Sequence, residues 1–327
     1  MRAEIRKIAV LGAGAWGTAL ANAAARPGRE VVLWARDRQH VAELLAAREN
    51  KRRLPGVKLS EGVAPQAELA TIADADLVLC VVPAQSLRSM AEQLKGIIRA
   101  DAPLVICAKG IERGTNLLLT DVVSQILPGQ PTAILSGPSF ADDVARGLPT
   151  AVTVAAKDEA LARALASALG TPTLRLYHST DVLGVEIGGA TKNVLAIACG
   201  IAAGRGLGAS AGAALIARGF AELSRFAASR GARPETLMGL SGLGDLVLTC
   251  SSAQSRNFSY GFALGRGDNL PEKLAEGAAT APVLLDMAQS SGVDMPIARA
   301  VAEILSGHLT VDQAIGVLLA RPQKAEG

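Results

Sequence analysis

The sequence contains few aromatic residues and few cysteines. Phe, Trp and Tyr make up 3% of the 327 residues, whereas half of the chain is hydrophobic. The cores must therefore be built from Ala, Val, Leu and Ile, and the chain is long enough for two of them. The four cysteines lie far apart and form no CxxC pair. This pattern suits a reducing compartment and argues against structural zinc, so we expect no metal site.

The sequence also lacks an excess of charge of either sign. Its 33 basic and 30 acidic residues leave a net charge of +3, and the densest basic run (51–53) contains no aromatic residue. A nucleic-acid surface is therefore not expected. No signal-peptide segment precedes the first apolar strand, and no membrane-spanning run of roughly 18 uncharged apolar residues remains once Lys192 is counted. These features predict a soluble cytoplasmic protein without integral membrane association.

The first motif is a glycine-rich turn between an apolar strand and an Ala-rich helix, with Gly12, Gly14 and Gly17 at GxGxxG spacing. Gly12 permits the tight turn, Gly14 lets the backbone approach a pyrophosphate, and Gly17 lets helix and strand pack closely. The pyrophosphate would lie against the N–H groups and positive dipole of the helix start. Strand, turn and helix together predict a dinucleotide cofactor, NAD or NADP.

Apolar strands alternate with helices through the first half of the chain. We predict strands at 8–11, 30–37, 77–82, 104–108, 132–135, 151–154 and 173–176. We predict helices at 38–49, 84–99, 116–127 and 158–169, and later, at helical spacing, at 185–203, 211–229, 281–291, 296–306 and 310–320. The pattern predicts a Rossmann-type, doubly wound parallel sheet over residues 1–180 and an all-α domain over 181–327.

Ligands on such a sheet bind outside the C-terminal ends of the strands, and two of those ends carry reactive groups. Lys109 follows the strand at 104–108, and Gly137 and Ser139 lie in the Gly/Pro turn SGPSF. Backbone amides and a hydroxyl in that turn are suited to hold substrate oxygens. A solvated loop lysine and an ordinary turn are the alternatives.

Lys192 stands alone as a charge in the apolar helical segment EIGGATKNVLAIACG. Burying an unpaired ammonium costs several kcal/mol, roughly, so this lysine either reaches solvent or has a function. An enzyme that transfers a hydride to a carbonyl also needs a general acid. His40 and His308 lie in helical settings remote from any motif and His178 follows the last strand, so Lys192 fits that role better than the histidines.

The remaining polar residues of the helical half lie mainly in GLGDLVLTCSSAQSRN. Asp245 is suited to orient Lys192, and Asn193 to hold a substrate hydroxyl. A hydroxyl, a guanidinium, an amide and helix-start N–H groups would together form a phosphate receptor at Ser255, Arg256 and Asn257. An ordinary helix cap at 255–257 and a turn at Asp245 are the alternatives.

Together these motifs resemble the soluble bacterial NAD(P)-dependent sn-glycerol-3-phosphate dehydrogenases. The resemblance runs through GAGAWGTALA, KGIE, SGPSFADDVARGLPTAV, EIGGATKNVLAIACGI, GLGDLVLTCSSAQSRN and LAEG. It implies reversible reduction of dihydroxyacetone phosphate to sn-glycerol 3-phosphate with NADPH or NADH, which supplies the phospholipid backbone. The small phosphorylated substrate is then the main partner. A homodimer is compatible with the motifs, which do not encode the oligomeric state.

The resemblance assigns roles to individual residues. Lys192 matches the catalytic lysine, Lys109 the lysine that touches cofactor and substrate, and Asp245 completes this set. The matched substrate positions are Gly137, Ser139, Asp245, Ser255, Arg256 and Asn257. The matched cofactor positions are Ala15, Trp16, Arg36, Ala141, Leu274 and Glu276, with Arg256 shared by both ligands.

The end of the second strand, LWARD, bears on the choice of cofactor. An acidic residue about 20 positions beyond the glycines usually accepts the ribose 2′-hydroxyl of NAD. Side chains alternate along a strand, so Arg36 and Asp37 should diverge. Arg36 is suited to pair with the 2′-phosphate of NADP, and Asp37 to cap the next helix. We expect use of both cofactors, with a preference for NADPH.

The chain departs from the family pattern after the lysine helix. Ala203, Ser210 and Gly212 stand where the family has an aspartate-glycine turn and an Asn-Ala-Arg run, and Thr191 and Phe258 also replace expected residues.

Two other functions stay open. A β-hydroxy-acid or ketopantoate-type dehydrogenase would not need the phosphate receptor, and a non-catalytic dinucleotide-sensing module would not need the set of two lysines and an aspartate.

Overall fold

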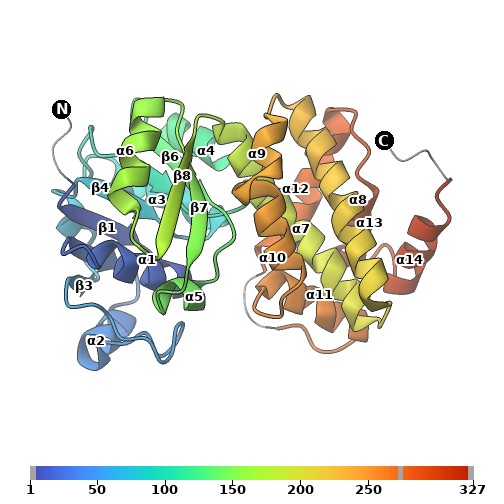
Figure 1. Cartoon of the computed structure of the whole chain (residues 1–327), viewed down its shortest axis with the longest axis horizontal. Helices are drawn as coiled ribbons and strands as arrows, with labels where there is room; N and C mark the ends of the chain where they lie inside the picture. Colours follow the sequence, from blue (N-terminus) through green and yellow to red (C-terminus); the bar gives the residue numbers. More distant parts are fainter. Residues whose placement is uncertain (1–4, 272–274, 323–327) are drawn as a thin grey trace. The chain divides into compact units, whose positions relative to one another are not determined.

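The computed structural model describes residues 5–271 and 275–322, and the chain divides into two compact units. Unit 1 comprises Met1–Glu112 and Leu117–Glu186, and unit 2 comprises Arg113–Asn116 and Ile187–Gly327. The strands all belong to the part coloured blue to green in Figure 1, and the yellow to red part is helical. The predicted fold class, an α/β sheet followed by an all-α half, is confirmed.

Unit 1 is built on one eight-stranded sheet with the order β3-β2-β1-β4-β5-β6-β7-β8. Its strands are β1 (Lys7–Leu11), β2 (Glu30–Trp34), β3 (Val63–Gln66), β4 (Leu77–Cys80), β5 (Leu104–Ile106), β6 (Thr132–Ser136), β7 (Thr150–Ala155) and β8 (Leu174–Ser179). From β1 the chain first adds strands on one side and then crosses to β4 on the other. The point where the strand order reverses, at which such sheets bind dinucleotides, therefore lies between β1 and β4.

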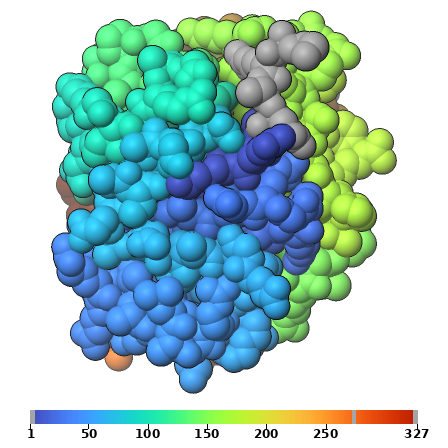
Figure 2. Space-filling model, turned by 90° about the vertical axis from the view of Figure 1, so that its left-hand side faces the viewer, coloured from blue at the N-terminus to red at the C-terminus, as the bar shows by residue number. Residues whose placement is uncertain are grey.

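Alternate residues of β1 point to opposite faces of the sheet, and helices cover both faces. Ile8 and Val10 belong to the core shared with α1 (Ala15–Ala25), α2 (Arg38–Ala47), α5 (Ala141–Ala145) and α6 (Glu159–Leu169). Ala9 and Leu11 belong to the core shared with α3 (Leu87–Leu94) and α4 (Leu119–Ile126). The central strands β4 and β5 are apolar throughout because both of their faces are buried, whereas the edge strand β8 carries polar and exposed residues. In Figure 2, the blue segments at the start of the chain form one continuous part of the face shown.

Two features of the sheet differ from the prediction. The sheet is not parallel throughout, because β7 is antiparallel to β6. The connection between these strands contains only the five-residue α5, which is too short to carry the chain back along the sheet. The edge strand β3 was not predicted, since Pro65 argues against a strand in sequence. Proline is tolerated there because an edge strand leaves one row of N–H groups unused.

Unit 2 contains most of α7 (Val182–Gly204), which begins in unit 1, and the helices that follow it. These are α8 (Gly208–Ser229), α9 (Pro234–Met238), α10 (Asp245–Cys250), α11 (Arg256–Arg266), α12 (Glu276–Ser290), α13 (Pro296–Leu305) and α14 (Val311–Leu319). A π-helical turn, Leu240–Gly244, precedes α10. Among the described residues, α7 alone is long and apolar enough to cross a membrane, and 94% of its apolar window is buried inside the protein.

Glycines bring the backbones of α7 and α11 into direct contact. A Cβ at Gly200 would lie 2.1 Å from the carbonyl oxygen of Phe258, and one at Gly261 would lie 2.1 Å from that of Ile197. Gly204 and Gly265 make equivalent contacts one turn further along the pair. Only glycine tolerates such an approach, so the register of α7 against α11 is tightly set.

Candidate active site

The glycine-rich loop joins β1 to α1. Gly12 has φ +111°, and a Cβ there would lie 3.0 Å from the carbonyl oxygen of Val81. A Cβ at Gly17 would lie 1.8 Å from the carbonyl oxygen of Gly12, so packing excludes any side chain at this position. A Cβ at Gly14, the N-cap of α1, would meet nothing within 4 Å. The helix start is thus open at Gly14, as the approach of a pyrophosphate requires.

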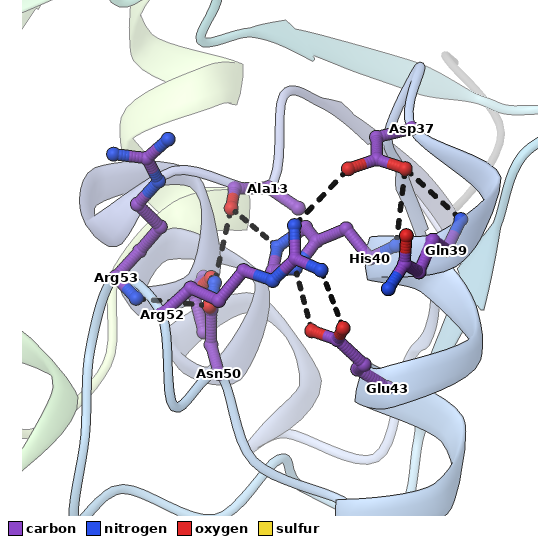
Figure 3. Close-up of polar contacts among 9 residues, drawn as sticks. Ala13, Asp37, Gln39, His40, Glu43, Asn50, Arg52 and Arg53 are labelled. Atoms are coloured by element: carbon purple, nitrogen blue, oxygen red, sulfur yellow. Dashed lines mark hydrogen bonds and ion pairs between the residues drawn. The ribbon is translucent and has the colours of Figure 1, made fainter.

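His40 and Asn50, neither of which the sequence linked to this loop, hold its backbone (Figure 3). Asn50 Nδ2 donates to the Ala13 carbonyl at 3.0 Å and to the Thr18 hydroxyl at 2.7 Å. The His40 Nε2 lies 3.3 Å from the same carbonyl oxygen, and both side chains are buried. The prediction that His40 is remote from any motif is therefore wrong. The contact spans 27 positions in sequence, and only the packing of α2 reveals it.

Asp37, beyond the end of β2, has the capping role that the sequence predicted. Asp37 caps α2, because its Oδ1 accepts the backbone N–H groups of Gln39 and His40 at 3.0 and 3.2 Å (Figure 3). The hydrogen bond from His40 is the main cause that lowers the pKa of Asp37. Its other oxygen accepts Arg52 Nη1 at 3.1 Å. Arg36 is exposed directly after the strand.

Lys109 and the SGPSF turn meet where β5 and β6 end. Lys109, half-buried, donates from Nζ to the Gly137 carbonyl at 3.1 Å, and the Ser139 hydroxyl donates to the same oxygen at 3.1 Å. Gly137 has φ +144°, and a Cβ there would lie 2.8 Å from the Cα of Val152. Lys109 is therefore not a simple solvated loop residue. Ala141 begins α5 just beyond this turn.

Lys192 is buried in unit 2, and its ammonium group is paired. Its side chain is 8% exposed, and Nζ lies 2.8 Å from Oδ1 of Asp245, whose side chain is 2% exposed. The Thr249 hydroxyl lies 2.7 Å from the same Nζ. The alternative of a lysine that reaches solvent is wrong, and so is that of Asp245 as a turn residue. Asp245 opens α10 directly after the π-helical turn, which places its carboxylate against α7.

A chain of amide hydrogen bonds continues from the residue after Lys192. The Asn257 Nδ2 donates to Asn193 Oδ1 at 2.9 Å, and Asn257 Oδ1 accepts the N–H of Gly277 at 2.9 Å. These bonds tie the starts of α11 and α12 to the middle of α7. A Cβ at Gly277 would lie 2.4 Å from the Asn193 carbonyl oxygen, so glycine is required in the LAEG motif.

The Ser-Arg-Asn segment forms the start of α11. The buried Ser255 is its N-cap and accepts the N–H of Phe258 at 3.2 Å, while Arg256 is exposed at the first helical position. A guanidinium and helix-start N–H groups thus lie together, which suits a phosphate. Glu276 is the half-buried first residue of α12, and Leu274 lies outside the described residues.

The other two histidines lie near glutamates on exposed parts of the chain. The His178 Nε2 is 4.0 Å from Glu159 Oε1, and its side chain is 39% exposed. The His308 Nδ1 is 3.0 Å from Glu303 Oε2, and its side chain is 73% exposed. Such exposed pairs are typical of surface histidines. The buried ion pair of Lys192 is the stronger candidate for a proton donor.

Thr191, the residue before Lys192, is buried and its hydroxyl has no hydrogen-bond partner. Because an unsatisfied buried hydroxyl costs about 1–3 kcal/mol, we expect Thr191→Val to raise the free energy of unfolding by about 1 kcal/mol. Urea denaturation measures this change. The matched control is Thr280→Val, which removes a buried hydroxyl that donates to the Glu276 carbonyl at 2.9 Å. Thr280→Val should lower the free energy of unfolding. An equal decrease with Thr191→Val would contradict the expectation.

Comparison with known proteins identifies the family. A model described as the N-terminus of NAD-dependent glycerol-3-phosphate dehydrogenase matches residues 7–162, and the model of the C-terminus matches residues 181–316. A relative from Azorhizobium caulinodans, named glycerol-3-phosphate dehydrogenase (NAD(P)+), is 62% identical over 322 residues, which cover 98% of each chain. A relative of the same name from a Bradyrhizobium species is 61% identical over the full length of both chains.

A solved structure agrees with these relatives. The crystal structure of glycerol-3-phosphate dehydrogenase from Coxiella burnetii is 40% identical and superimposes with a TM-score of 0.92, covering 97% of this chain and 99% of that one. Both halves of the chain are thus matched, in sequence and in fold. The chain belongs to the NAD-dependent glycerol-3-phosphate dehydrogenase family.

Proposed function

We propose that the chain catalyses the reversible, NAD(P)H-dependent reduction of dihydroxyacetone phosphate to sn-glycerol 3-phosphate for phospholipid synthesis. The hydrogen bond between Asn193 and Asn257 is the observation that carries this proposal. It joins the residue after Lys192 to the residue after Arg256. A buried lysine and an exposed guanidinium at a helix start are thereby held on neighbouring helices, as a phosphorylated carbonyl compound requires.

Lys192 acts as the general acid in the direction of reduction. A bound nicotinamide supplies the hydride, and the Lys192 ammonium gives its proton to the carbonyl oxygen as negative charge develops there. Asp245 and Thr249 fix the position of Nζ through bonds of 2.8 and 2.7 Å. In the reverse direction the neutral amine accepts the hydroxyl proton, and the Asp245 carboxylate stabilises the ammonium that forms. Asn193, next to Lys192, is assigned to the substrate hydroxyl.

Arg256 and the start of α11 receive the substrate phosphate. The guanidinium is suited to pair with two phosphate oxygens, and the N–H groups of the first turn add the positive end of the helix dipole. The hydroxyl of Ser255 and the amide of Asn257 are assigned to the same group. Both side chains are buried, so their positions are set before the ligand arrives.

In this proposal, unit 1 supplies the dinucleotide site, and unit 2 supplies the general acid and the phosphate receptor. The boundary between the dinucleotide-binding and helical domains is placed near residue 180. The open helix start at Gly14 fits a pyrophosphate, because no side chain fills it. Ala15, Trp16, Ala141 and Glu276 are assigned to the cofactor, and Lys109 to both ligands. The remaining substrate residues in unit 1 are Gly137 and Ser139, whose turn is held by the bond from Lys109.

The proposed function is tested by following the loss of NADPH or NADH fluorescence on addition of dihydroxyacetone phosphate. Rapid consumption with this substrate, much slower consumption with dihydroxyacetone and none with ketopantoate are expected. A ketopantoate-type dehydrogenase would show the reverse preference, since a carboxylate substrate has no use for the receptor at Arg256. A non-catalytic sensing module would bind the cofactor without turnover.

We expect Arg36→Ala to lower kcat/KM for NADPH about tenfold more than for NADH. A hydrogen bond to a charged group contributes about 1.5–3 kcal/mol, and exposure of Arg36 keeps the effect at the lower end. Arg38→Ala is the matched control, because Arg38 is also exposed but is ion-paired with Glu68. Equal losses for the two cofactors would show that Arg36 does not recognise the 2′-phosphate.

The proposal includes a cytoplasmic location and a homodimer. The four cysteines are free and buried, which suits a reducing compartment. Analytical ultracentrifugation of the purified chain tests the oligomeric state directly.

A further inference from the structure

Unit 2 contains a hollow of about 380 Å³ that lies against the last turns of α7, the start of α8 and the end of α10. Ala203 and Gly212, two of the departures from the family pattern, line it, and a Cβ at Gly212 would meet nothing within 4 Å. The small side chain of Ala203 and the absence of one at Gly212 thus leave this space open. Two thiols, those of Cys199 and Cys250, lie in the wall of the same hollow.

These two cysteines come from α7 and α10, which lie far apart in sequence, and their side chains are close enough to influence each other's pKa. The neighbouring Cys250 side chain, as a hydrogen-bond partner, lowers the pKa of the Cys199 thiol, and Cys199 together with burial raises the pKa of Cys250. A thiol whose pKa is lowered is the better nucleophile near neutral pH. Cys80 and Cys107 contrast with this pair, since burial in the sheet core raises the pKa of Cys80 to about 12 and also raises that of Cys107.

The thiol pair is linked directly to the proposed proton donor. Cys199 lies two helical turns beyond Lys192 on α7. Cys250 follows Thr249, whose hydroxyl lies 2.7 Å from the Lys192 Nζ. Any displacement of the end of α10 therefore moves a group that positions Nζ.

The packing around the two cysteines determines whether α7 or α10 moves when the sulfurs are joined. Joining them brings the two sulfurs to about 2.05 Å from each other. Cys199 precedes Gly200, whose contact with the backbone of Phe258 locks α7 against α11. Cys250 is the last residue of a six-residue helix, α10, that follows a π-helical turn. The shift therefore falls on α10 and carries Thr249 with it.

We propose that Cys199 and Cys250 form a peroxide-sensitive site whose oxidation to a disulfide reversibly inactivates the enzyme. The Cys199 thiolate attacks hydrogen peroxide and the O–O bond breaks, which gives Cys199 sulfenic acid and a hydroxide that takes up the proton released by the Cys199 thiol and leaves as water. The Cys250 sulfur then attacks the sulfenic sulfur and releases the second water, so the two thiols are oxidised and the peroxide oxygens are reduced. Inactivation follows from displacement of Thr249 and thus rests on the proposed role of Lys192.

The test treats the full-length enzyme with hydrogen peroxide and follows kcat, free thiols and peptide masses. We expect a loss of kcat of at least tenfold, a disulfide-linked peptide pair containing Cys199 and Cys250, and recovery of both signals with dithiothreitol. Cys199→Ala and Cys250→Ala should each abolish the reversible inactivation, and Cys250→Ser serves if the alanine variant does not fold. Cys80→Ala and Cys107→Ala are the matched controls and should remain sensitive.

Filling the hollow provides a second test. Gly212→Arg should slow oxidation by peroxide, because the new side chain enters the space through which peroxide reaches the thiols. Peptide mapping reports the disulfide without any need for activity, so it separates this proposal from the proposed function. The proposal is overturned if no peptide pair forms, if the pair forms while kcat stays unchanged, or if the cysteine variants are inactivated as fast as the unaltered enzyme.

Discussion

Lys192→Ala should reduce kcat by several orders of magnitude while NADPH still binds. A general acid contributes about 10²–10⁴-fold, and the loss of a group that orients the substrate adds to this. NADPH binding should persist because the glycine-rich loop belongs to unit 1, where Asn50 and His40 hold Ala13. Stopped-flow turnover and titration of cofactor fluorescence measure the two quantities separately.

The control must account for the buried partner of Lys192. Removing the lysine leaves the carboxylate of Asp245, which is 2% exposed, without its counter-charge, and breaking such a pair costs about 3–5 kcal/mol of stability. The double substitution Lys192→Met with Asp245→Asn removes both charges and should fold while remaining inactive. If Lys192→Ala kept nearly full turnover while His178→Ala abolished it, the proton donor would be misassigned.

Arg256→Ala should remove most of the discrimination between dihydroxyacetone phosphate and dihydroxyacetone. The substitution leaves a phosphate dianion without its bidentate partner, at a cost of about 2–5 kcal/mol in kcat/KM. The loss should appear with the phosphorylated substrate and be nearly absent with the unphosphorylated one. Steady-state kinetics with the two substrates measure this difference.

Arg266→Ala is the matched control for Arg256→Ala. Arg266 lies at the other end of α11, is exposed and pairs with Asp268 at 2.8 Å, so its loss should leave the ratio of the two kcat/KM values unchanged. Arg256→Lys should recover only part of the discrimination, because an ammonium is a point charge without the planar fork of a guanidinium. An Arg256→Ala enzyme that discriminates as well as the unaltered one would exclude the phosphate role.

The sequence predicted the regular parts of the fold because they depend on local patterns. The GxGxxG turn, the apolar strands and the helical repeats of the second half all have short sequence periods, and the cap at Asp37 follows from its place before α2. The edge strand β3 escaped prediction because Pro65 is unfavourable within a strand, and α9 and α10 escaped because five and six residues are too few to show a helical repeat. The antiparallel β7 escaped because both strand directions show the same apolar pattern.

By itself the sequence determined which residue types are the candidates for the chemistry: a lone lysine in an apolar helix, an aspartate, and a Ser-Arg-Asn helix start. Only the tertiary structure decided what each group contacts. The pairing of Lys192 with Asp245 and Thr249, the hold of His40 on the glycine loop and the meeting of Cys199 with Cys250 join residues that lie far apart along the chain. The physical reason is that these contacts depend on how whole helices pack, which no short stretch of sequence encodes.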